Sequence, residues 1–178
     1  MGTPNITATS EISTQHGIVQ LCWRDEELFQ VRIGPYTPTK RPATIRRYGP
    51  PHEIGRHLIA QVLSYFQGKP VDFDCPLPDK VGTDFQRRVW NALREIPYAH
   101  AKTYGELALR LGLCLTTARA VGAACGQNPL PILFPCHRVV AATGALTGFS
   151  AGVAWKKALL QLEGVAIQHD RIRIFKIH

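Results

Sequence analysis

Residues 103–126 read TYGELALRLGLCLTTARAVGAACG, and this stretch predicts two short helices joined by a turn. Thr103 and Glu106 have the spacing of a capping box, which starts the first helix, and the glycine near the centre of the stretch ends it. The second helix is expected to begin near Thr116 or Thr117 and to reach the end of the stretch. Two such helices give the outline of a helix-turn-helix, although many small helical pairs bind no DNA.

The second of these helices is built mostly from small residues. Its short side chains belong to Ala118, Ala120, Gly122, Ala123 and Ala124. Close packing against another helix is the more common reason for such a pattern. A helix of this kind can also approach a bound partner closely, and both interpretations stay open on this pattern alone.

Charge is distributed unevenly along the 178 residues, whose net charge is +8. Residues 1–82 carry nine Lys or Arg against eight Asp or Glu, whereas residues 83–178 carry twelve against five. A basic excess of this kind is typical of a surface that binds a phosphate backbone, although it can also serve solubility alone.

The first half of the chain predicts an antiparallel hairpin followed by one helix. Two β-forming runs, residues 18–23 and 28–33, flank an acidic turn at residues 25–27. Residues 34–51 are rich in Pro, Thr and Arg and are expected to form an exposed loop. Apolar side chains then recur at helical spacing over residues 54–66. We therefore expect an α/β domain with an antiparallel sheet.

The second half is expected to be mostly helical. Segment 71–80 contains two prolines and predicts a connector, which divides the chain into domains 1–82 and 83–178. A capping box of Thr83 and Gln86 starts a further helix directly after this boundary.

The five cysteines are odd in number and include no Cys-x-x-Cys pair, so neither a disulfide framework nor a zinc ribbon is predicted. We expect reduced thiols and no bound metal. The first 13 residues lack the features of a secretory signal, and no apolar run reaches the roughly 18 residues that span a bilayer. These features predict an intracellular protein, cytoplasmic or, in a eukaryote, nuclear, without a membrane segment.

Cys136 is the candidate nucleophile. Residues 131–134, Pro-Ile-Leu-Phe, predict a buried strand that Pro135 breaks directly before Cys136. A cysteine at such a bend can face a cleft, although an inert core cysteine is the more common case. A nucleophilic thiol needs a base, and His137 follows in the chain. Because adjacent side chains usually diverge, the proton would pass through a water.

Glu163 is the candidate partner of this histidine, since a catalytic imidazole is usually oriented by a carboxylate. It ends the last strong predicted helix, directly before the capping Gly164. The helix dipole disfavours a carboxylate there, so the placement indicates a tertiary role. An ordinary exposed glutamate at a helix end is the alternative.

The stretch ILFPCHRVV, residues 132–140, resembles the active-site signature of the O6-alkylguanine-DNA alkyltransferases. Five further segments stand in the order of that family, at residues 82–90, 104–108, 119–122, 128–129 and 156–164. The resemblance extends from about residue 65 to residue 164. It implies a ribonuclease H-like first domain and a mostly helical, winged-helix-like second domain.

The resemblance implies direct repair of DNA by one irreversible, stoichiometric transfer. The alkyl group of O6-alkylguanine in double-stranded DNA, with O4-alkylthymine as a second candidate substrate, would move to Cys136. His137 and Glu163 would remove the thiol proton through a bridging water. Tyr104 would hydrogen-bond the extruded guanine and give it a proton as it leaves. The resemblance implies no cofactor, and we expect a monomer.

Further roles follow from the same resemblance. Arg119 would fill the gap left in the base stack, and Asn128 would be the hinge between the recognition helix and the active-site loop. Other minor-groove contacts are expected from Thr117, Ala118, Ala120 and Gly122. The pocket for the flipped base would be lined by Val139, Phe149, Ser150 and Ala151.

Two positions depart from the family pattern, because Ala99 and Ala151 stand where glycine is usual. The second would narrow the pocket for bulky adducts. Two other function classes are a helix-turn-helix DNA-binding protein without catalysis and a cysteine hydrolase that uses Cys136 and His137. The first predicts no covalent transfer, and the second predicts repeated turnover.

Overall fold

The computed structural model describes residues 6–47 and 53–172. The chain forms two compact units, Met1–Asp79 and Lys80–His178, and the division falls inside the predicted connector. No helix in the described part of the chain is long and apolar enough to cross a membrane.

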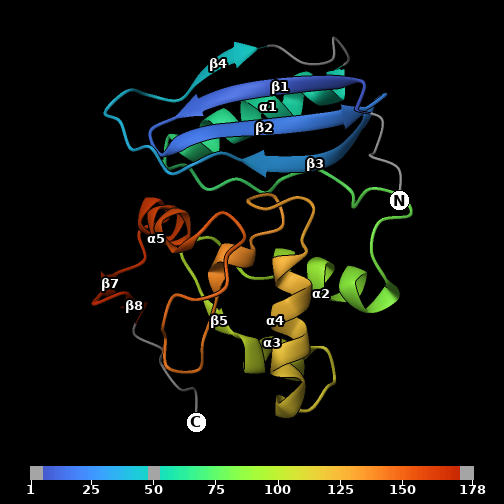
Figure 1. Ribbon diagram of the computed structural model, residues 1–178, viewed down its shortest axis with the longest axis vertical. Coiled ribbons are helices and arrows are strands. Elements are labelled where there is room, and N and C mark those ends of the chain that lie inside the picture. Colours follow the sequence, from blue (N-terminus) through green and yellow to red (C-terminus); the bar gives the residue numbers. More distant parts are fainter. Residues whose placement is uncertain (1–5, 48–52, 173–178) are drawn as a thin grey trace. The chain divides into compact units, whose positions relative to one another are not determined.

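A four-stranded antiparallel sheet and one helix make up the first unit (Figure 1). In chain order the strands are β1 (Ala8–Thr14), β2 (Gly17–Arg24), β3 (Glu27–Ile33) and β4 (Thr44–Arg47), and in the sheet their order is β3-β2-β1-β4. Helix α1 (Glu53–Phe66) lies along one face of the sheet. Its buried Leu58 and Val62, with Leu21 and Trp23 of β2, contribute to an apolar core.

The predicted hairpin is confirmed, because β2 and β3 pair in antiparallel register around residues 25 and 26. Two strands are missing from the prediction. β1 lies in the polar start of the chain, where Ser10 is fully buried and accepts a 3.0 Å hydrogen bond from Nε1 of Trp23. β4 lies in residues 34–51, so the expectation of a loop throughout that stretch is wrong. Backbone pairing with a neighbouring strand, rather than local apolar patterning, forms both.

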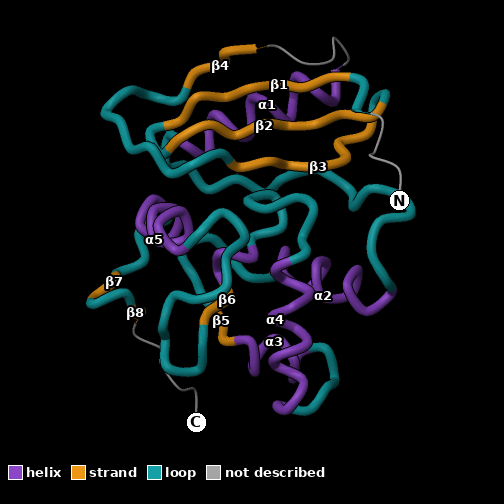
Figure 2. The backbone as a smooth tube through the Cα atoms, in the orientation of Figure 1, coloured by secondary structure: helices purple, strands orange, loops and turns teal. Residues whose placement is uncertain are grey.

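The second unit is mostly helix and loop, with only short strands (Figure 2). Its helices are α2 (Asp84–Arg94), α3 (Tyr104–Arg110), α4 (Ala118–Gly126) and α5 (Val153–Leu162), with 3-10 turns η1 (Leu115–Thr117) and η2 (Cys136–Arg138). The two-residue strands are β5 (Lys102–Thr103), β6 (Val139–Val140), β7 (Ile167–Gln168) and β8 (Arg171–Ile172). An α/β unit followed by a mostly helical one is the predicted architecture.

Both predicted capping boxes are present, at the start of α2 and at the start of α3. Helix α4 begins at Ala118, close to its predicted start, and buries Val121, Ala124 and Cys125. Nε1 of Trp90 on α2 donates to the Ala124 carbonyl at 2.8 Å, so the small residues of α4 do serve helix packing on one face.

The predicted strand at residues 131–134 is wrong. All four residues are buried, but they form consecutive turns rather than extended chain. Ile132 has a φ of 78°, which lies outside the β region and is unusual for a β-branched residue. The N–H of Phe134 donates to the Leu130 carbonyl at 2.9 Å, which closes the loop on itself. The prediction that this apolar run is buried is confirmed, whereas the prediction that it is extended is wrong.

A short parallel pair links the start of α3 to the chain after Cys136. In this pair Lys102 lies opposite Val139 and Thr103 lies opposite Val140. Because Thr103 is the N-cap of α3, the pairing brings Tyr104 close to the segment that bears the candidate nucleophile.

Candidate active site

Cys136 begins η2, directly after the buried loop of residues 128–135. Asn128 fixes this loop, because its Nδ2 donates to the Phe134 carbonyl at 2.7 Å and its Oδ1 accepts from the Leu130 N–H at 3.0 Å. The N–H of Cys136 donates to the same Phe134 carbonyl at 2.7 Å. One amide side chain therefore orders the backbone that positions the thiol.

The thiol of Cys136 is buried, with 4% of the residue exposed. Burial raises the pKa of Cys136, because a thiolate is poorly stabilised away from water. A hydrogen bond from Asn128, the charge of Lys156 and nearby backbone N–H groups act in the opposite direction and lower it. The net shift is upward, so at neutral pH the thiol keeps its proton until a base removes it.

Glu163 is a buried carboxylate at the C-cap of α5. Its Oε1 lies 2.7 Å from Nε2 of His137. Arg138 donates from Nε to Oε2 at 2.9 Å and from Nη2 to Oε1 at 3.0 Å, while the N–H of Ala99 donates to Oε2 at 3.2 Å. Arg138 also donates from Nη1 to the Ile96 carbonyl at 2.7 Å. The structure thus brings together the imidazole and carboxylate that the sequence analysis paired, and it adds an arginine.

These contacts set the protonation states of the buried group. Burial would raise the pKa of Glu163, but the hydrogen bond with His137 and the hydrogen bonds and charge of Arg138 lower it to about 2. Burial lowers the pKa of His137, and Glu163 opposes only part of that shift. An ionised carboxylate only accepts hydrogen bonds, so the proton of the neutral ring lies on Nε2 and Nδ1 is its basic nitrogen. His137 is therefore able to accept a proton.

Tyr104 begins α3, and its hydroxyl donates to the Thr147 carbonyl at 3.2 Å. Burial raises the pKa of Tyr104 to about 12, so the phenol keeps its proton across the neutral range. A Cβ added to Gly122 would lie 3.7 Å from its ring, and one added to Gly148 would lie 3.1 Å from its hydroxyl. Gly148 also has a φ of 64°, so a side chain there would be strained. Tyr104 is therefore a protonated phenol with two glycines packed closely against it.

Three of the predicted pocket residues follow one another in the loop before α5. Phe149 is buried, and its ring meets that of His137 edge-on, with centroids 6.5 Å apart and planes at 85°. Ser150 is exposed and Ala151 is half-buried. The fourth, Val139, is fully buried next to η2. The structure therefore places Phe149 and Val139 beside the catalytic candidates and leaves the Ser150 side chain open to solvent.

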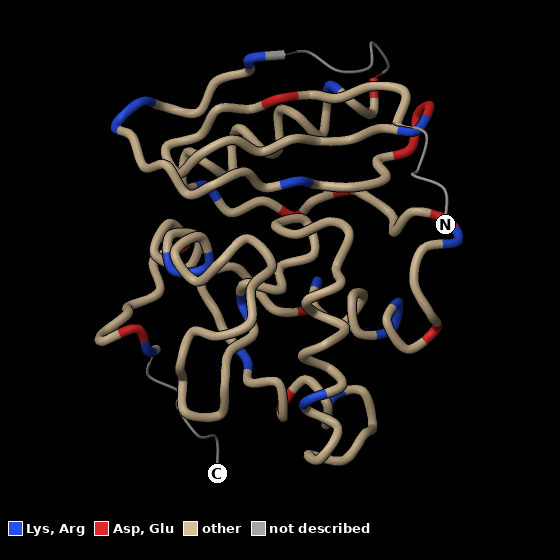
Figure 3. Tube along the Cα trace, viewed as in Figure 1, with Lys and Arg blue, Asp and Glu red and all other residues tan. Residues whose placement is uncertain are grey.

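Four of the predicted DNA contacts lie in helix α4 and the fifth is its N-cap: Ala118, Arg119, Ala120, Gly122 and the capping Thr117. Arg119 and Ala120 are exposed, and the other three are partly buried. Residues 120–137, which lead from this helix to the thiol, include no Lys, Arg, Asp or Glu (Figure 3). The exposed guanidinium of Arg119 is therefore followed by a long uncharged segment.

Lys156, for which the sequence predicts no role, has a completely buried side chain. Its Nζ donates to the Val139 carbonyl at 2.5 Å and to the Thr147 carbonyl at 2.6 Å. A signal was present, because Lys156, Leu160 and Glu163 share the helical spacing of one buried face. A lysine on such a face is rare unless it has a defined partner.

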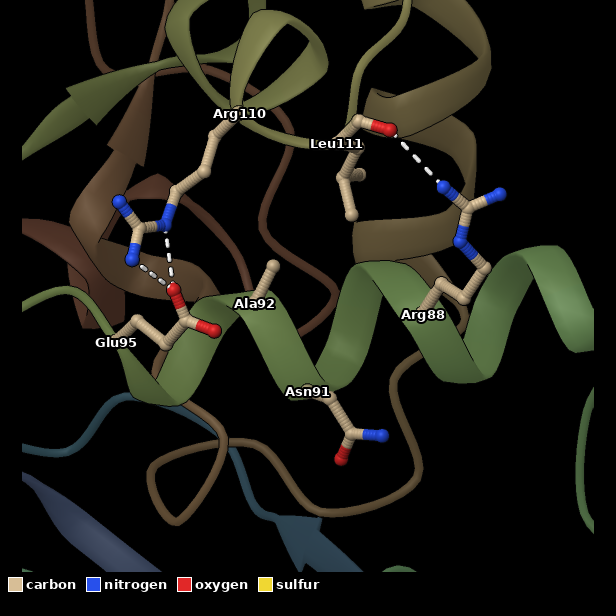
Figure 4. A pocket seen from close by; sticks show the side chains of 6 residues that line it. All are labelled: Arg88, Asn91, Ala92, Glu95, Arg110 and Leu111. Atoms are coloured by element: carbon tan, nitrogen blue, oxygen red, sulfur yellow. Dashed lines mark hydrogen bonds and ion pairs between the residues drawn. The ribbon is translucent and has the colours of Figure 1, made fainter.

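A separate hollow of about 400 Å³ lies between α2 and the end of α3 (Figure 4). It is lined by Arg88, Asn91, Ala92, Glu95, Arg110 and Leu111. Arg110 is paired with Glu95, and Nη2 of Arg88 donates to the Leu111 carbonyl at 2.9 Å. Both cations of the hollow are thus engaged within the protein, and none of the predicted site residues lines it.

All five cysteines are free; Cys114 is exposed, and the other four are buried. Within residues 6–47 and 53–172, no group of three or more His, Cys, Asp or Glu side chains is arranged to hold a metal ion.

Comparisons with known proteins agree on one family. A family model described as the DNA binding domain of 6-O-methylguanine DNA methyltransferase matches residues 84–165. A methylated-DNA–protein-cysteine methyltransferase of Mycobacterium tuberculosis is 50% identical over 105 residues, which are 59% of this chain and 62% of that protein. The protein of the same name from Mycolicibacterium paratuberculosis is 42% identical over 149 residues, which cover 83% of this chain and 86% of the relative.

A solved structure of Mycobacterium tuberculosis OGT in complex with DNA superposes with a TM-score of 0.72 at 39% identity. The match covers 88% of this chain and 92% of that one. The 105-residue sequence match to the Mycobacterium tuberculosis methyltransferase covers about three fifths of the length of that protein.

Replacing Glu163 with Gln should lower the free energy of unfolding by about 3 to 5 kcal/mol, because Arg138 would lose its charge partner in a buried site. Glu95→Gln is the matched control, since its ion pair with Arg110 is exposed and should contribute less than about 1 kcal/mol. Chemical denaturation at pH 7 measures both.

Acid should reduce the difference in the free energy of unfolding between wild type and Glu163→Gln. The pKa of Glu163 lies at about 2 in the folded protein, below its ordinary value of 4.5, so the carboxylate stabilises the fold fully above pH 4.5. Its contribution is lost as the pH falls from 4.5 toward 2. The gap between wild type and Glu163→Gln should therefore narrow over that range, and a gap that stays constant would contradict the assignment.

Proposed function

Because this chain belongs to the family of methylated-DNA–protein-cysteine methyltransferases, we propose that it repairs DNA by moving an alkyl group from the O6 atom of guanine onto Cys136. Each molecule would act once, since the product is a stable thioether. The observation that carries the proposal is a buried thiol followed in the chain by a neutral imidazole that a buried carboxylate orients.

The reaction is a substitution at the alkyl carbon. His137 takes the proton of the Cys136 thiol through a water, and the thiolate sulfur forms a bond to the carbon of the adduct. The bond between that carbon and O6 breaks, and its electron pair stays on the guanine. Tyr104 gives a proton to the departing base, which a phenol that is protonated at neutral pH can do. The step needs no cofactor.

The DNA would be bound by the helix-turn-helix, with α4 in the minor groove. Its small residues would allow a close approach, and the exposed Arg119 would occupy the gap left by the flipped base. Asn128 would couple α4 to the active-site loop, since its N–H contacts the Cys125 carbonyl at 3.3 Å and its side chain holds Phe134. The flipped base would be bound by Val139, Phe149, Ser150 and Ala151.

We further propose that the first domain, residues 1–82, is ribonuclease H-like and that the second, residues 83–178, is winged-helix-like. The protein would act as a monomer inside the cell on double-stranded DNA that contains O6-alkylguanine. Support comes from the antiparallel sheet of the first unit, the helical second unit and the DNA-bound relative.

The central test is transfer of radiolabel from duplex DNA that contains O6-[methyl-³H]methylguanine. Wild type should become labelled once per molecule, and Cys136→Ser should not, because a serine hydroxyl is far less ionised than a thiol. Cys114→Ser is the matched control, since Cys114 is exposed and should be dispensable. Label on Cys136→Ser would overturn the assignment, as would DNA binding by wild type without any label. Repeated turnover would favour a hydrolase.

Base flipping predicts a difference between two substrates. Arg119→Ala should slow transfer from duplex DNA by roughly tenfold or more, because extrusion costs a few kcal/mol that the arginine offsets. Its rate with free O6-alkylguanine should stay near that of wild type, since a free base needs no flipping. Arg88→Ala, an exposed arginine on α2, should change neither rate. Equal slowing of Arg119→Ala on both substrates would remove Arg119 from this role.

The proton relay predicts a change in pH dependence. Without a base, the thiol of Cys136 must ionise unaided against its raised pKa, so His137→Ala should shift the rate profile to higher pH. At pH 7 its rate should fall by about 10²-fold. Transfer from free O6-alkylguanine between pH 5 and pH 9 is the measurement, and the exposed His100→Ala is the control. Coincident profiles for wild type and a folded His137→Ala would rule out the relay.

A further inference from the structure

Lys156 is a buried cation that the reaction described above does not use. It lies in the second turn of α5, and none of its surface is exposed. Its Nζ donates to the carbonyl of Val139, three residues after Cys136, and to the carbonyl of Thr147, which also accepts from the Tyr104 hydroxyl. One ammonium thus joins the chain that leaves the nucleophile to the loop that contacts the proposed proton donor.

The surroundings of this ammonium make its charge unusual. Among the described residues, Lys156 takes part in no ion pair, and Glu163 on the same helix is already paired with Arg138. The groups that interact with it include the thiols of Cys136 and Cys125, the imidazole of His137, whose pKa it lowers, and the ring of Tyr104, whose centroid lies 5.8 Å from Nζ.

Both thiols can become negative, but only one of them is the proposed nucleophile. Burial raises the pKa of Cys125 to about 12, so this thiol stays neutral under ordinary conditions. Burial also lowers the pKa of Lys156 to about 8, although the two thiols oppose that shift. A buried cation gains most from an anion that forms beside it, because little water screens the interaction. Ionisation of Cys136 supplies such an anion.

We propose that Lys156 is a positioning residue for alkyl transfer, which ties the Val139 segment to the Thr147 loop and offsets the charge of the Cys136 thiolate. The inference rests on the proposed function. His137 and Lys156 then have separate tasks: the imidazole receives the proton, and the ammonium stabilises the anion that remains. Alkylation ends this interaction, because a thioether sulfur carries no charge.

The test compares three variants by their rate of reaction with free O6-alkylguanine from pH 5 to pH 10. Lys156→Met removes the charge and keeps a similar length, so the midpoint of the profile should rise by about one pH unit or more, and the rate at pH 7 should fall roughly tenfold. Lys156→Arg keeps the charge and should recover most of the midpoint. Lys157→Met is the matched control, because Lys157 is partly exposed and paired with Asp170 at 2.7 Å. Its profile should equal that of wild type.

A reciprocal measurement leaves Lys156 unchanged and therefore does not depend on the folding of its variants. The Cys136 thiol is still protonated at the pH at which Lys156 titrates, so the reciprocal effect on the lysine is measured with a carboxylate at position 136 in place of the thiolate. Nuclear magnetic resonance titration of the Lys156 side chain should accordingly show a higher pKa in Cys136→Asp than in Cys136→Asn, which has nearly the same shape and no charge.

Three outcomes would overturn the inference: a folded Lys156→Met with the wild-type midpoint, a shift in Lys156→Arg as large as that in Lys156→Met, or equal lysine pKa values in Cys136→Asp and Cys136→Asn. Each is distinguishable from failure of the proposed function, because there wild type itself would take up no alkyl group.

Discussion

The second unit depends on the hydrogen bonds that the buried carboxylate of Glu163 accepts. This carboxylate receives hydrogen bonds from His137 and Arg138 of η2 and from the N–H of Ala99 in the loop after α2. Three segments far apart in the chain therefore meet at one pair of oxygen atoms. A buried charge without partners is strongly unfavourable, so the site forms only when the three segments come together.

The same carboxylate decides the chemistry of its neighbours. Arg138 is the positively charged partner of the Glu163 carboxylate. The carboxylate therefore does not need a protonated imidazole to balance its charge. Burial and the nearby positive charges of Arg138 and Lys156 then keep His137 neutral. A neutral ring with its proton on Nε2 leaves the other nitrogen basic, which a proton acceptor requires. In the proposed relay, Arg138 would thus act on the thiol indirectly, through the protonation state of the histidine.

Two further constraints bring the remaining groups to this centre. Asn128 holds the loop before Cys136 in a shape that includes Ile132 at a positive φ, so its amide hydrogen bonds stabilise a backbone that local preference would not choose. The parallel pairing of Thr103 with Val140 places the start of α3 beside the segment after the thiol. The proposed nucleophile and proton acceptor of η2, the carboxylate at the end of α5 and the proposed proton donor of α3 are consequently positioned by backbone and buried polar contacts.

The sequence by itself determined the features that depend on local chemistry. Capping boxes at Thr83 and Thr103 located the starts of two helices, and the contact between His137 and Glu163 followed from residue type and family order. It did not determine β1, whose Ser10 is buried beneath Trp23, or the turns at residues 131–134, because backbone pairing and the Asn128 hydrogen bonds override the local pattern there. Nor did it determine that Lys156 lies beside the Cys136 thiol. Helical spacing places Lys156 on the same face as Leu160 and Glu163, but spacing does not say how deeply that face is buried. The packing of α5 against η2 removes the ammonium from water.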